Sequence, residues 1–280
     1  MHNEFGASPR YLGLYANRLS DYESHLHHEI GWVRDPLSAF LDPTSYSIVT
    51  IEPSPTSRFS FVTTARSRRV FELFWKRRLN YETRNTLYLY DYFRENPISA
   101  AAAGWIFELS MHEMLKKGQI IQLFPVLGRR KEADLIYDNY AASNGRNNPT
   151  SLQLTRSEEY PFIEGHKLRR DRYYRVESTN SAVHSLLLIR PPGELPILLI
   201  FRMIHDQGEY DANMDGLLKI NDSNVSPKAR RCCVVVTPEN FHPEIKVPME
   251  YFGDKGRQMP PDEVFRVFHC PVSMNKLFGY

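Results

Sequence analysis

Glu108 is the residue whose surroundings constrain its chemistry most. It is the only charged residue from Ile98 to Met111, within a run whose side chains are otherwise almost all apolar. If this run is a helix, the carboxylate is desolvated, and it must then be neutral, paired with a base or bound to a metal. His112 lies one helical turn further along the same face. A buried ion pair between Glu108 and an arginine is the structural interpretation.

Other motifs for metal or nucleotide chemistry are incomplete. His112–Lys116 begins like the helix of a zinc protease, but Lys116 replaces the second histidine ligand. The sequence has no phosphate-binding loop, no glycine-rich dinucleotide motif and no G-x-S-x-G motif. Three histidines stand in a segment without a further ligand and are interpreted as solvated: His25, His27 and His28. The cysteines lack the C-x2-C spacing and are interpreted as small hydrophobic residues: Cys232, Cys233 and Cys270. We therefore expect no cofactor and no metal site.

Two arginine-rich segments could bind a polyanion. The first basic run, residues 58–84, has a local net charge of +6 and contains Arg58, Arg66, Arg68, Arg69, Lys76, Arg77, Arg78 and Arg84. Its aromatic residues fit two interpretations: base stacking beside phosphate contacts, or the buried face of an amphipathic helix. The second basic run, residues 167–175, contains Lys167, Arg169, Arg170, Arg172 and Arg175 beside Tyr173 and Tyr174. We expect weak binding to the DNA or RNA backbone through these runs.

The elements that would position these residues are predicted from hydrophobic period, caps and breakers. Residues 1–60 are rich in proline and read as loops around one short strand at Tyr46–Ile51. Helices are predicted at Thr64–Leu79 with Thr64 as cap, Asn85–Glu95, Ile98–Lys117, Asp211–Ile220 and Pro261–Phe268. Strands are predicted at Gln119–Leu127, Ser151–Thr155, Arg172–Glu177, Val183–Ile189, Ile197–Ile204 and Cys232–Thr237, and a loop or hairpin tip within Glu132–Thr150.

This succession predicts an α/β fold, with a mixed sheet flanked by helices. Asn96-Pro97 divides the chain into a smaller helical or irregular segment, residues 1–96, and an α/β domain, residues 97–280. With 280 residues and 42% hydrophobic content, the chain has apolar material for one large core or two smaller ones. Its apolar runs are too short for a membrane span and its start shows no secretory signal, so we expect an intracellular protein, cytoplasmic or nuclear.

Five segments together resemble the C-terminal domain of Crinkler-type and retrotransposon-hot-spot-like proteins. They are Ala103–Glu108, Arg172–Val176, Asn180–Ser185, Leu195–Phe201 and Cys233–Pro238. The resemblance covers roughly residues 90–280 and implies a restriction-endonuclease-like, PD-(D/E)XK fold. It also implies that residues 1–96 are a remnant of an upstream ATPase module, without its nucleotide loop.

The resemblance assigns catalytic positions to residues of this chain. A helix glutamate, a strand aspartate and a following Glu or Gln hold Mg²⁺ in such nucleases, with a lysine or its substitute two positions on. Here the helix position is Glu108, the aspartate position is His184, the next is Arg202 and the last is Ile204. A guanidinium repels Mg²⁺ and an isoleucine transfers no proton, so the site is degenerate. Arg202 is then the expected ion-pair partner of Glu108.

The sequence thus leads to a nuclease-like fold that has lost metal-dependent cleavage and acts as a nucleic-acid-binding or effector-like protein. One alternative is an active Mg²⁺-dependent nuclease that uses shifted carboxylates from Glu177, Glu194 or Asp206. A second alternative is an effector that contacts a protein partner without binding nucleic acid. Composition leaves all three open.

Overall fold

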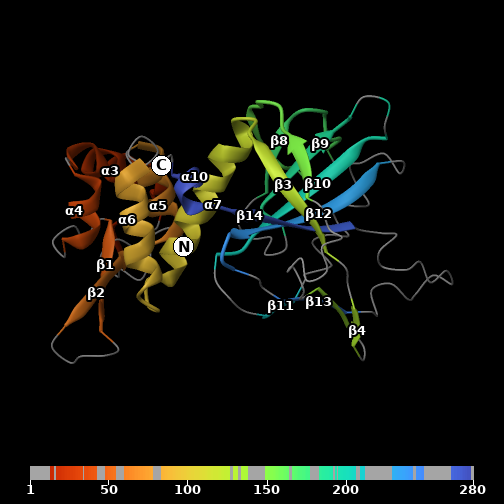
Figure 1. Cartoon of the computed structure of the whole chain (residues 1–280). Helices are drawn as coiled ribbons and strands as arrows, with labels where there is room; N and C mark the ends of the chain where they lie inside the picture. Colours follow the sequence, from red (N-terminus) through yellow and green to blue (C-terminus); the bar gives the residue numbers. More distant parts are fainter. Residues whose placement is uncertain are drawn as a thin grey trace. The chain divides into compact units, whose positions relative to one another are not determined.

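The structure is a computed structural model, shown in Figure 1. It describes residues 13–15, 17–33, 35–42, 48–54, 60–77, 83–126, 129–131, 134–137, 149–163, 166–176, 183–191, 193, 195–205, 209–211, 229–241, 244–248 and 266–278. The chain forms two compact units. The first comprises Met1–Ser110 and Phe278–Tyr280, and the second Met111–Leu277.

The first unit is mainly helical. Its elements are α3 (Leu19–Trp32), α4 (Pro36–Leu41), the antiparallel strands β1 (Val49–Pro53) and β2 (Phe61–Ala65), α5 (Arg68–Arg77), α6 (Thr83–Arg94) and the start of α7 (Ala100–Lys116). Phe40 lies at the centre of its core, 4.8 Å from Phe74 and 5.7 Å from Phe93 between ring centroids. Edge-to-face aromatic pairs of this kind stabilise a core beyond their buried area.

The prediction of loops for residues 1–60 is wrong, because α3 and α4 occupy much of that segment. The apolar stripe of α3 is narrow and consists of Tyr22, Leu26 and Ile30, at a spacing of four residues. Such a stripe gives a weak periodic signal, and packing against the rest of the unit supplies most of a helix's stability. The strand predicted at Tyr46–Ile51 corresponds to β1, and the part of it at residues 46–47 lies outside the described residues.

The helix predicted at Thr64–Leu79 is α5, but it begins four residues later than expected. Thr64 belongs to β2, and the cap is Ser67, whose Oγ accepts a hydrogen bond of 3.2 Å from the backbone N–H of Val70. The helix buries its aliphatic and aromatic side chains: Val70, Phe71, Leu73, Phe74 and Trp75. This confirms the amphipathic-helix interpretation of the first basic run. The helix predicted at Asn85–Glu95 is confirmed as α6.

Helix α7 confirms the prediction at Ile98–Lys117 within two residues at each end. It ends before Gly118, whose φ of +75° favours glycine. A Cβ there would lie 2.5 Å from the backbone nitrogen of Arg156, so the close approach also requires glycine. The two units divide within α7, between Ser110 and Met111, whereas the predicted boundary at Asn96-Pro97 precedes this helix.

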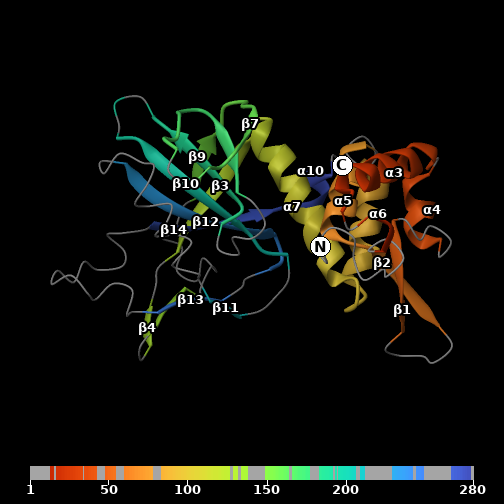
Figure 2. The ribbon, with the colours of Figure 1, turned by 180° about the vertical axis from the view of Figure 1, so that it is seen from behind.

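An eight-stranded sheet forms the centre of the second unit (Figures 1 and 2). Its order is β6-β3-β14-β12-β10-β9-β8-β7, and it is mixed, since β10–β12, β12–β14 and β7–β8 are parallel and the other pairs are antiparallel. The strands are β3 (Ile120–Val126), β6 (Thr150–Gln153), β7 (Glu159–Pro161), β8 (Tyr173–Arg175), β9 (Ser185–Ile189), β10 (Ile197–Met203), β12 (Arg230–Pro238) and β14 (Arg266–Val272). The mixed α/β class is therefore confirmed.

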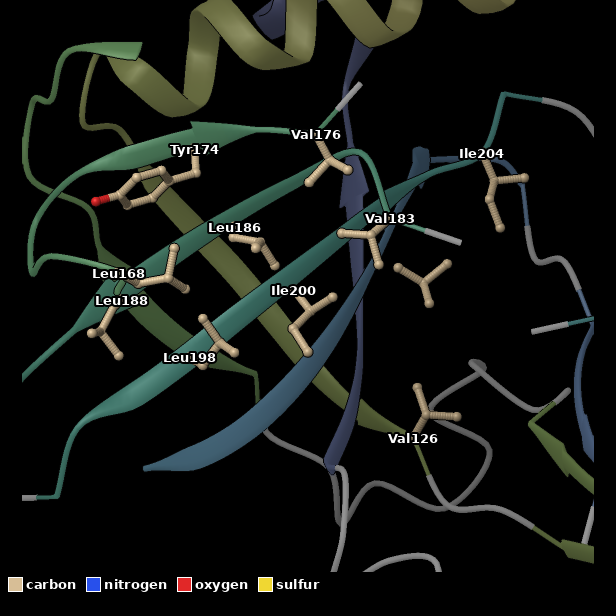
Figure 3. Close-up of a cluster of buried hydrophobic side chains, with 11 residues drawn as sticks. Val126, Leu168, Tyr174, Val176, Val183, Leu186, Leu188, Leu198, Ile200 and Ile204 are labelled. Carbon is tan, nitrogen blue, oxygen red and sulfur yellow. The ribbon is translucent and has the colours of Figure 1, made fainter. Parts of the chain in front are cut away.

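The core of the second unit lies on this sheet, and Figure 3 shows one of its clusters. In the antiparallel register of β9 and β10, Leu188 faces Leu198 and Leu186 faces Ile200, so these side chains share one face. The residues between them are buried as well, and all five residues of β9 are buried. A strand covered on both faces reads as a continuous apolar run, which is why the sequence revealed β9 and β10.

Two predicted helices differ from the structure or lie outside its description. Arg266–Phe268, predicted as the end of a helix, belong to β14, which pairs with β12 and β3. Hydrogen bonds to strands distant in sequence outweigh local preference there. Residues 212–220 and 261–265 of the predicted helices lie outside the described residues. The predicted loop or hairpin tip, residues 143–149, lies outside the described residues except for Pro149. Earlier in the same polar segment, β5 (Asp134–Tyr137) forms a second sheet with β4 (Arg129–Lys131), β11 (Glu209–Asp211) and β13 (Glu244–Pro248).

Candidate nucleic-acid interface

The second basic run begins in the connection between β7 and β8, and three contacts fix this connection on the sheet. Leu168 is buried in the core cluster of Figure 3. The backbone N–H of Arg169 donates to the hydroxyl of Tyr174 at 2.9 Å, and that of Asp171 donates to the carbonyl of Leu188 at 2.9 Å. Asp171 adopts a φ of 55°, a left-handed conformation that aspartate tolerates better than most residues. The cationic side chains around these anchors are therefore held on an ordered backbone.

A hollow of about 950 Å³ opens beside this connection. Its lining includes every cation predicted for nucleic-acid binding in the second basic run: Lys167, Arg169, Arg170 and Arg172. His166 adds a further nitrogen donor, and Tyr160 and Tyr174 supply aromatic surface. None of the described lining residues is acidic. The hollow therefore combines positive charge with aromatic rings.

Tyr160 and Arg172 form a stacked pair on one wall of the hollow. The guanidinium carbon of Arg172 lies 4.4 Å from the centroid of the Tyr160 ring, within the range of a cation–π contact. Tyr174 lies beside Tyr160, with ring centroids 6.0 Å apart. The Tyr160 hydroxyl donates to Glu158 at 2.8 Å, and this hydrogen bond raises the pKa of Tyr160. Tyr160 thus remains a neutral ring at physiological pH.

The cations of the hollow and those of the first basic run differ in whether they pair with carboxylates. Lys167, Arg169 and Arg170 are exposed, and their side chains pair with no carboxylate within the described ranges. In the first basic run, Arg68 pairs with Glu72 and Glu108. These three cations of the second run therefore retain their charge for a ligand, whereas Arg175 of the same run pairs with Glu159.

Most of the other cations of the first run also contact groups within the protein or have side chains outside the described residues. Arg69 pairs with Glu23, and Arg77 donates to the backbone carbonyl of His27 at 3.1 Å. Lys76 is exposed on α5. The side chains of Arg58, Arg78 and Arg84 lie outside the description, and Arg66 is half-buried. The first run thus offers a ligand fewer available cations than its composition suggests.

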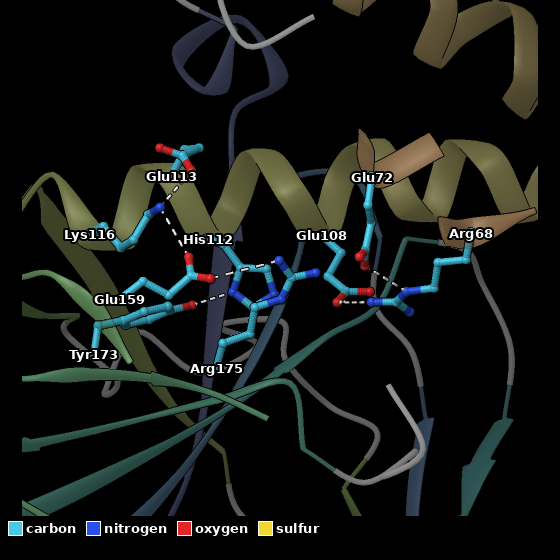
Figure 4. A network of polar contacts seen from close by, with 9 residues as sticks. All are labelled: Arg68, Glu72, Glu108, His112, Glu113, Lys116, Glu159, Tyr173 and Arg175. Carbon is cyan, nitrogen blue, oxygen red and sulfur yellow. Dashed lines mark hydrogen bonds and ion pairs between the residues drawn. The ribbon is translucent and has the colours of Figure 1, made fainter. Parts of the chain in front are cut away.

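Glu108 pairs with Arg68 inside the first unit, as the dashed contacts at the right of Figure 4 show. Arg68 Nη2 lies 2.5 Å from Glu108 Oε1 and Nε lies 3.2 Å from Glu72 Oε1. Burial opposes the charge of Arg68, but the two carboxylates outweigh it and raise the pKa of Arg68 above its ordinary value. The expected arginine partner of Glu108 is confirmed, and it is Arg68. Arg202 belongs to the second unit, so a pair between Glu108 and Arg202 stays untested.

A second polar cluster, which the sequence did not reveal, joins the end of α7 to β7 and β8 within the second unit (Figure 4). Nδ1 of the buried His112 lies 2.5 Å from the hydroxyl of the buried Tyr173. Lys116 Nζ lies 3.0 Å from Glu159 and 2.6 Å from Glu113. No local sequence pattern links Tyr173 to α7, because its partner His112 is 61 positions away in the chain.

Lys116 and Glu159 stabilise each other's charged forms. Burial alone would raise the pKa of Glu159, but the hydrogen bond and charge of Lys116, with the charge of Arg175, lower it below its ordinary value. Burial alone would lower the pKa of Lys116, and the carboxylates of Glu113 and Glu159 raise it instead. The cluster therefore attaches α7 to the sheet through charged hydrogen bonds.

His184 directly precedes β9, and Arg202 lies on β10, at one end of the β9–β10 pair. The backbone N–H of His184 donates to Phe201 at 2.9 Å, and its Nδ1 accepts a hydrogen bond of 3.1 Å from the backbone N–H of Met203. Arg202 lies next to Met203 on β10, and Ile204 is buried. The helix position of the family, Glu108, belongs to the other unit.

Metal-ligating side chains do not cluster in the part of the chain that is described: there, no group of three or more His, Cys, Asp or Glu side chains could hold an ion. The three alternative carboxylates, Glu177, Glu194 and Asp206, lie outside the described residues. Burial raises the pKa of Cys233 to about 11 and of Cys270 to about 12, so both are thiols at neutral pH.

Comparison with protein-family models, with curated proteins and with solved structures finds no match for this chain. Among the described helices, none has both the length and the apolar character needed to cross a bilayer.

Proposed function

We propose that this protein binds nucleic acid through the hollow beside the β7–β8 connection and does not cleave it with Mg²⁺. The observation that carries the proposal is the set of exposed cations without carboxylate partners among the described residues, Lys167, Arg169 and Arg170. Cations that are already paired inside a protein gain little from a phosphate, whereas these three can exchange water and counterions for phosphate oxygens. The ordered backbone beneath them reduces the entropy lost on binding.

The same proposal includes the family suggested by the sequence, a restriction-endonuclease-like sheet with a degenerate site. The mixed sheet supports it, as do the neighbouring positions of His184, directly before β9, and Arg202 on β10. A permanently charged guanidinium at Arg202 opposes Mg²⁺ and favours a phosphate. In this proposal the site contributes to binding and supplies no hydrolytic water.

Binding is tested by fluorescence anisotropy of labelled oligonucleotides at several salt concentrations. We expect the logarithm of the affinity to fall linearly with the logarithm of salt concentration, with a slope of about −0.7 to −0.9 for each phosphate contacted. The triple variant Lys167→Ala, Arg169→Ala and Arg170→Ala should lose affinity by at least about tenfold and reduce this slope by about 2.

The matched control removes three exposed cations elsewhere in the second unit, by Lys117→Ala, Arg156→Ala and Lys276→Ala. Both triple variants change the net charge equally, so only a local site separates them. Equal losses would show general attraction to a basic protein and would overturn the proposed site. Absence of binding at low salt would overturn the proposed function.

Cleavage is tested with supercoiled plasmid and structured RNA in the presence of Mg²⁺. We expect no cleavage by the wild-type chain. Cleavage that disappears in a folded Glu108→Gln variant would overturn the proposal, and Glu177, Glu194 and Asp206 would then be the carboxylates to substitute next.

A further inference from the structure

The stacked pair in the hollow has a property that phosphate binding does not explain. Arg172 places its guanidinium 4.4 Å from the ring of Tyr160 instead of extending alone into solvent like its neighbours Arg169 and Arg170. The stacked guanidinium is planar, and its outer face can receive a second flat group. Lysine has no such face, which is the physical difference between the two cations.

The size of the hollow fits a flat group of this kind. Pockets that enclose small organic ligands measure roughly 300–1,000 Å³, and this hollow has a volume of about 950 Å³. Beside the stack it presents the Tyr174 ring and the aliphatic side chains of Ile163 and Leu168. Cations and apolar surface thus lie in one hollow, as a ligand with both phosphate and base requires.

We infer that the hollow takes single-stranded nucleic acid, with one base stacked against the Arg172–Tyr160 pair and adjacent phosphates on Lys167, Arg169 and Arg170. This inference rests on the proposed function and specifies its ligand. In a duplex the faces of the bases are covered by neighbouring bases, so a stacking surface has nothing to receive. A phosphate-only site would bind duplex and single strand through charge alone.

The experiment compares probes that carry equal numbers of phosphates per strand. Anisotropy is measured with a single-stranded DNA and a single-stranded RNA of about 12 nucleotides, an abasic strand of the same length, and the corresponding duplex. We expect the strands with bases to bind about tenfold more tightly than the abasic strand. The DNA and RNA probes distinguish the two sources of the same chemistry.

Variants at matched positions isolate the stack. Arg172→Lys keeps the charge and removes the planar group, so the preference for bases over the abasic strand should disappear while the salt slope is retained. Arg170→Lys makes the same substitution at a cation with no stacked ring, and it should preserve the preference. Tyr160→Phe keeps the ring and should also preserve it, whereas Tyr160→Leu should remove it. Thermal unfolding of each variant establishes that it is folded.

The outcomes separate this inference from the proposed function. Binding to all probes with equal affinity, or an unchanged base preference in Arg172→Lys, overturns the single-strand inference and leaves the phosphate site standing. Tighter binding of the duplex overturns it as well. No binding to any probe at low salt overturns both.

Discussion

The two basic runs have similar composition and opposite use of their charge. In the first, Arg68 and Arg69 face inward to carboxylates of α3, α5 and α7. In the second, Lys167, Arg169 and Arg170 extend from a fixed connection into a hollow whose described lining has no acidic side chain. A count of arginines therefore does not distinguish a binding surface from an internal ion-pair network.

The two runs differ in this way because their backbones place the cations in different surroundings. Helix α5 buries its apolar face and brings its first arginines against neighbouring helices, where desolvation requires a partner. Among the described residues of the β7–β8 connection, Leu168 is the one that is buried, and Lys167, Arg169 and Arg170 stay in water. A buried cation thus needs a carboxylate, whereas an exposed one is available to a ligand.

The largest expected effect is a loss of protein stability when an ion pair of the first run is broken. Arg68→Gln leaves Glu108, with 8% of its side chain exposed, and Glu72, with 17%, without their guanidinium. We expect the free energy of unfolding in urea to fall by about 3 kcal/mol. Arg170→Ala in the second run should change it by less than about 0.5 kcal/mol. Equal effects of the two substitutions would break the comparison.

A double-mutant cycle sharpens this result. Adding Glu108→Gln to Arg68→Gln removes the stranded carboxylate, so part of the lost stability should return. The two losses would simply add if Arg68 and Glu108 did not interact. The cycle therefore measures the ion pair itself instead of a general effect of helix substitution.

The next effect concerns a hydrogen bond between two buried side chains, for comparison with the ion pairs. Tyr173→Phe removes the hydroxyl that meets Nδ1 of His112, and both side chains are at most 1% exposed. We expect a loss of about 1–2 kcal/mol in the free energy of unfolding, because a buried nitrogen loses its hydrogen bond. Tyr88→Phe, at a ring that is 55% exposed, serves as the control and should have little effect. If Tyr173→Phe left the free energy of unfolding unchanged, His112 would have another sufficient partner.

The sequence correctly predicted those elements whose local hydrophobic pattern agrees with their burial in the fold. Helix α7 and strands β9, β10 and β12 are mostly apolar and mostly buried, and all four were predicted. Helix α3 and strand β14 were missed. Their stability depends on partners distant in the chain, for which a short window holds no signal.

The site shows the same limit. Composition identified the cations Lys167 to Arg172, but not the Tyr160 ring that one of them stacks on, because strand β7 was not predicted. Composition also could not show that Arg69 is paired, because Glu23 is 46 positions away. Burial required a partner for Glu108 and correctly indicated an arginine, while the choice of Arg68 depended on the packing of α5.

A smaller effect is expected from pH on the ion pairs of the second unit. The lowered pKa of Glu159 means that its pair with Lys116 contributes stability above about pH 4.5, its ordinary value, and that this contribution is lost as pH falls through the lower folded value. Over that range, we expect the free energy of unfolding to decline more in the wild type than in Glu159→Gln. The difference between the two declines should be below about 1 kcal/mol. Lys116→Met should flatten the profile in the same way. Parallel profiles would contradict the pairing.

The smallest expected effect is that of Lys76→Ala on nucleic-acid affinity. Lys76 is an exposed cation of the first run, so it tests that run without disturbing the ion pairs of Arg68 and Arg69. Because those arginines are neutralised by carboxylates, the local positive potential is reduced and a phosphate gains little there. We expect a change of less than about twofold in anisotropy titrations, against about three- to fivefold for Arg170→Ala in the hollow. If Lys76→Ala weakened binding as much as Arg170→Ala, the first run would belong to the interface, and the contrast between paired and available cations would fail.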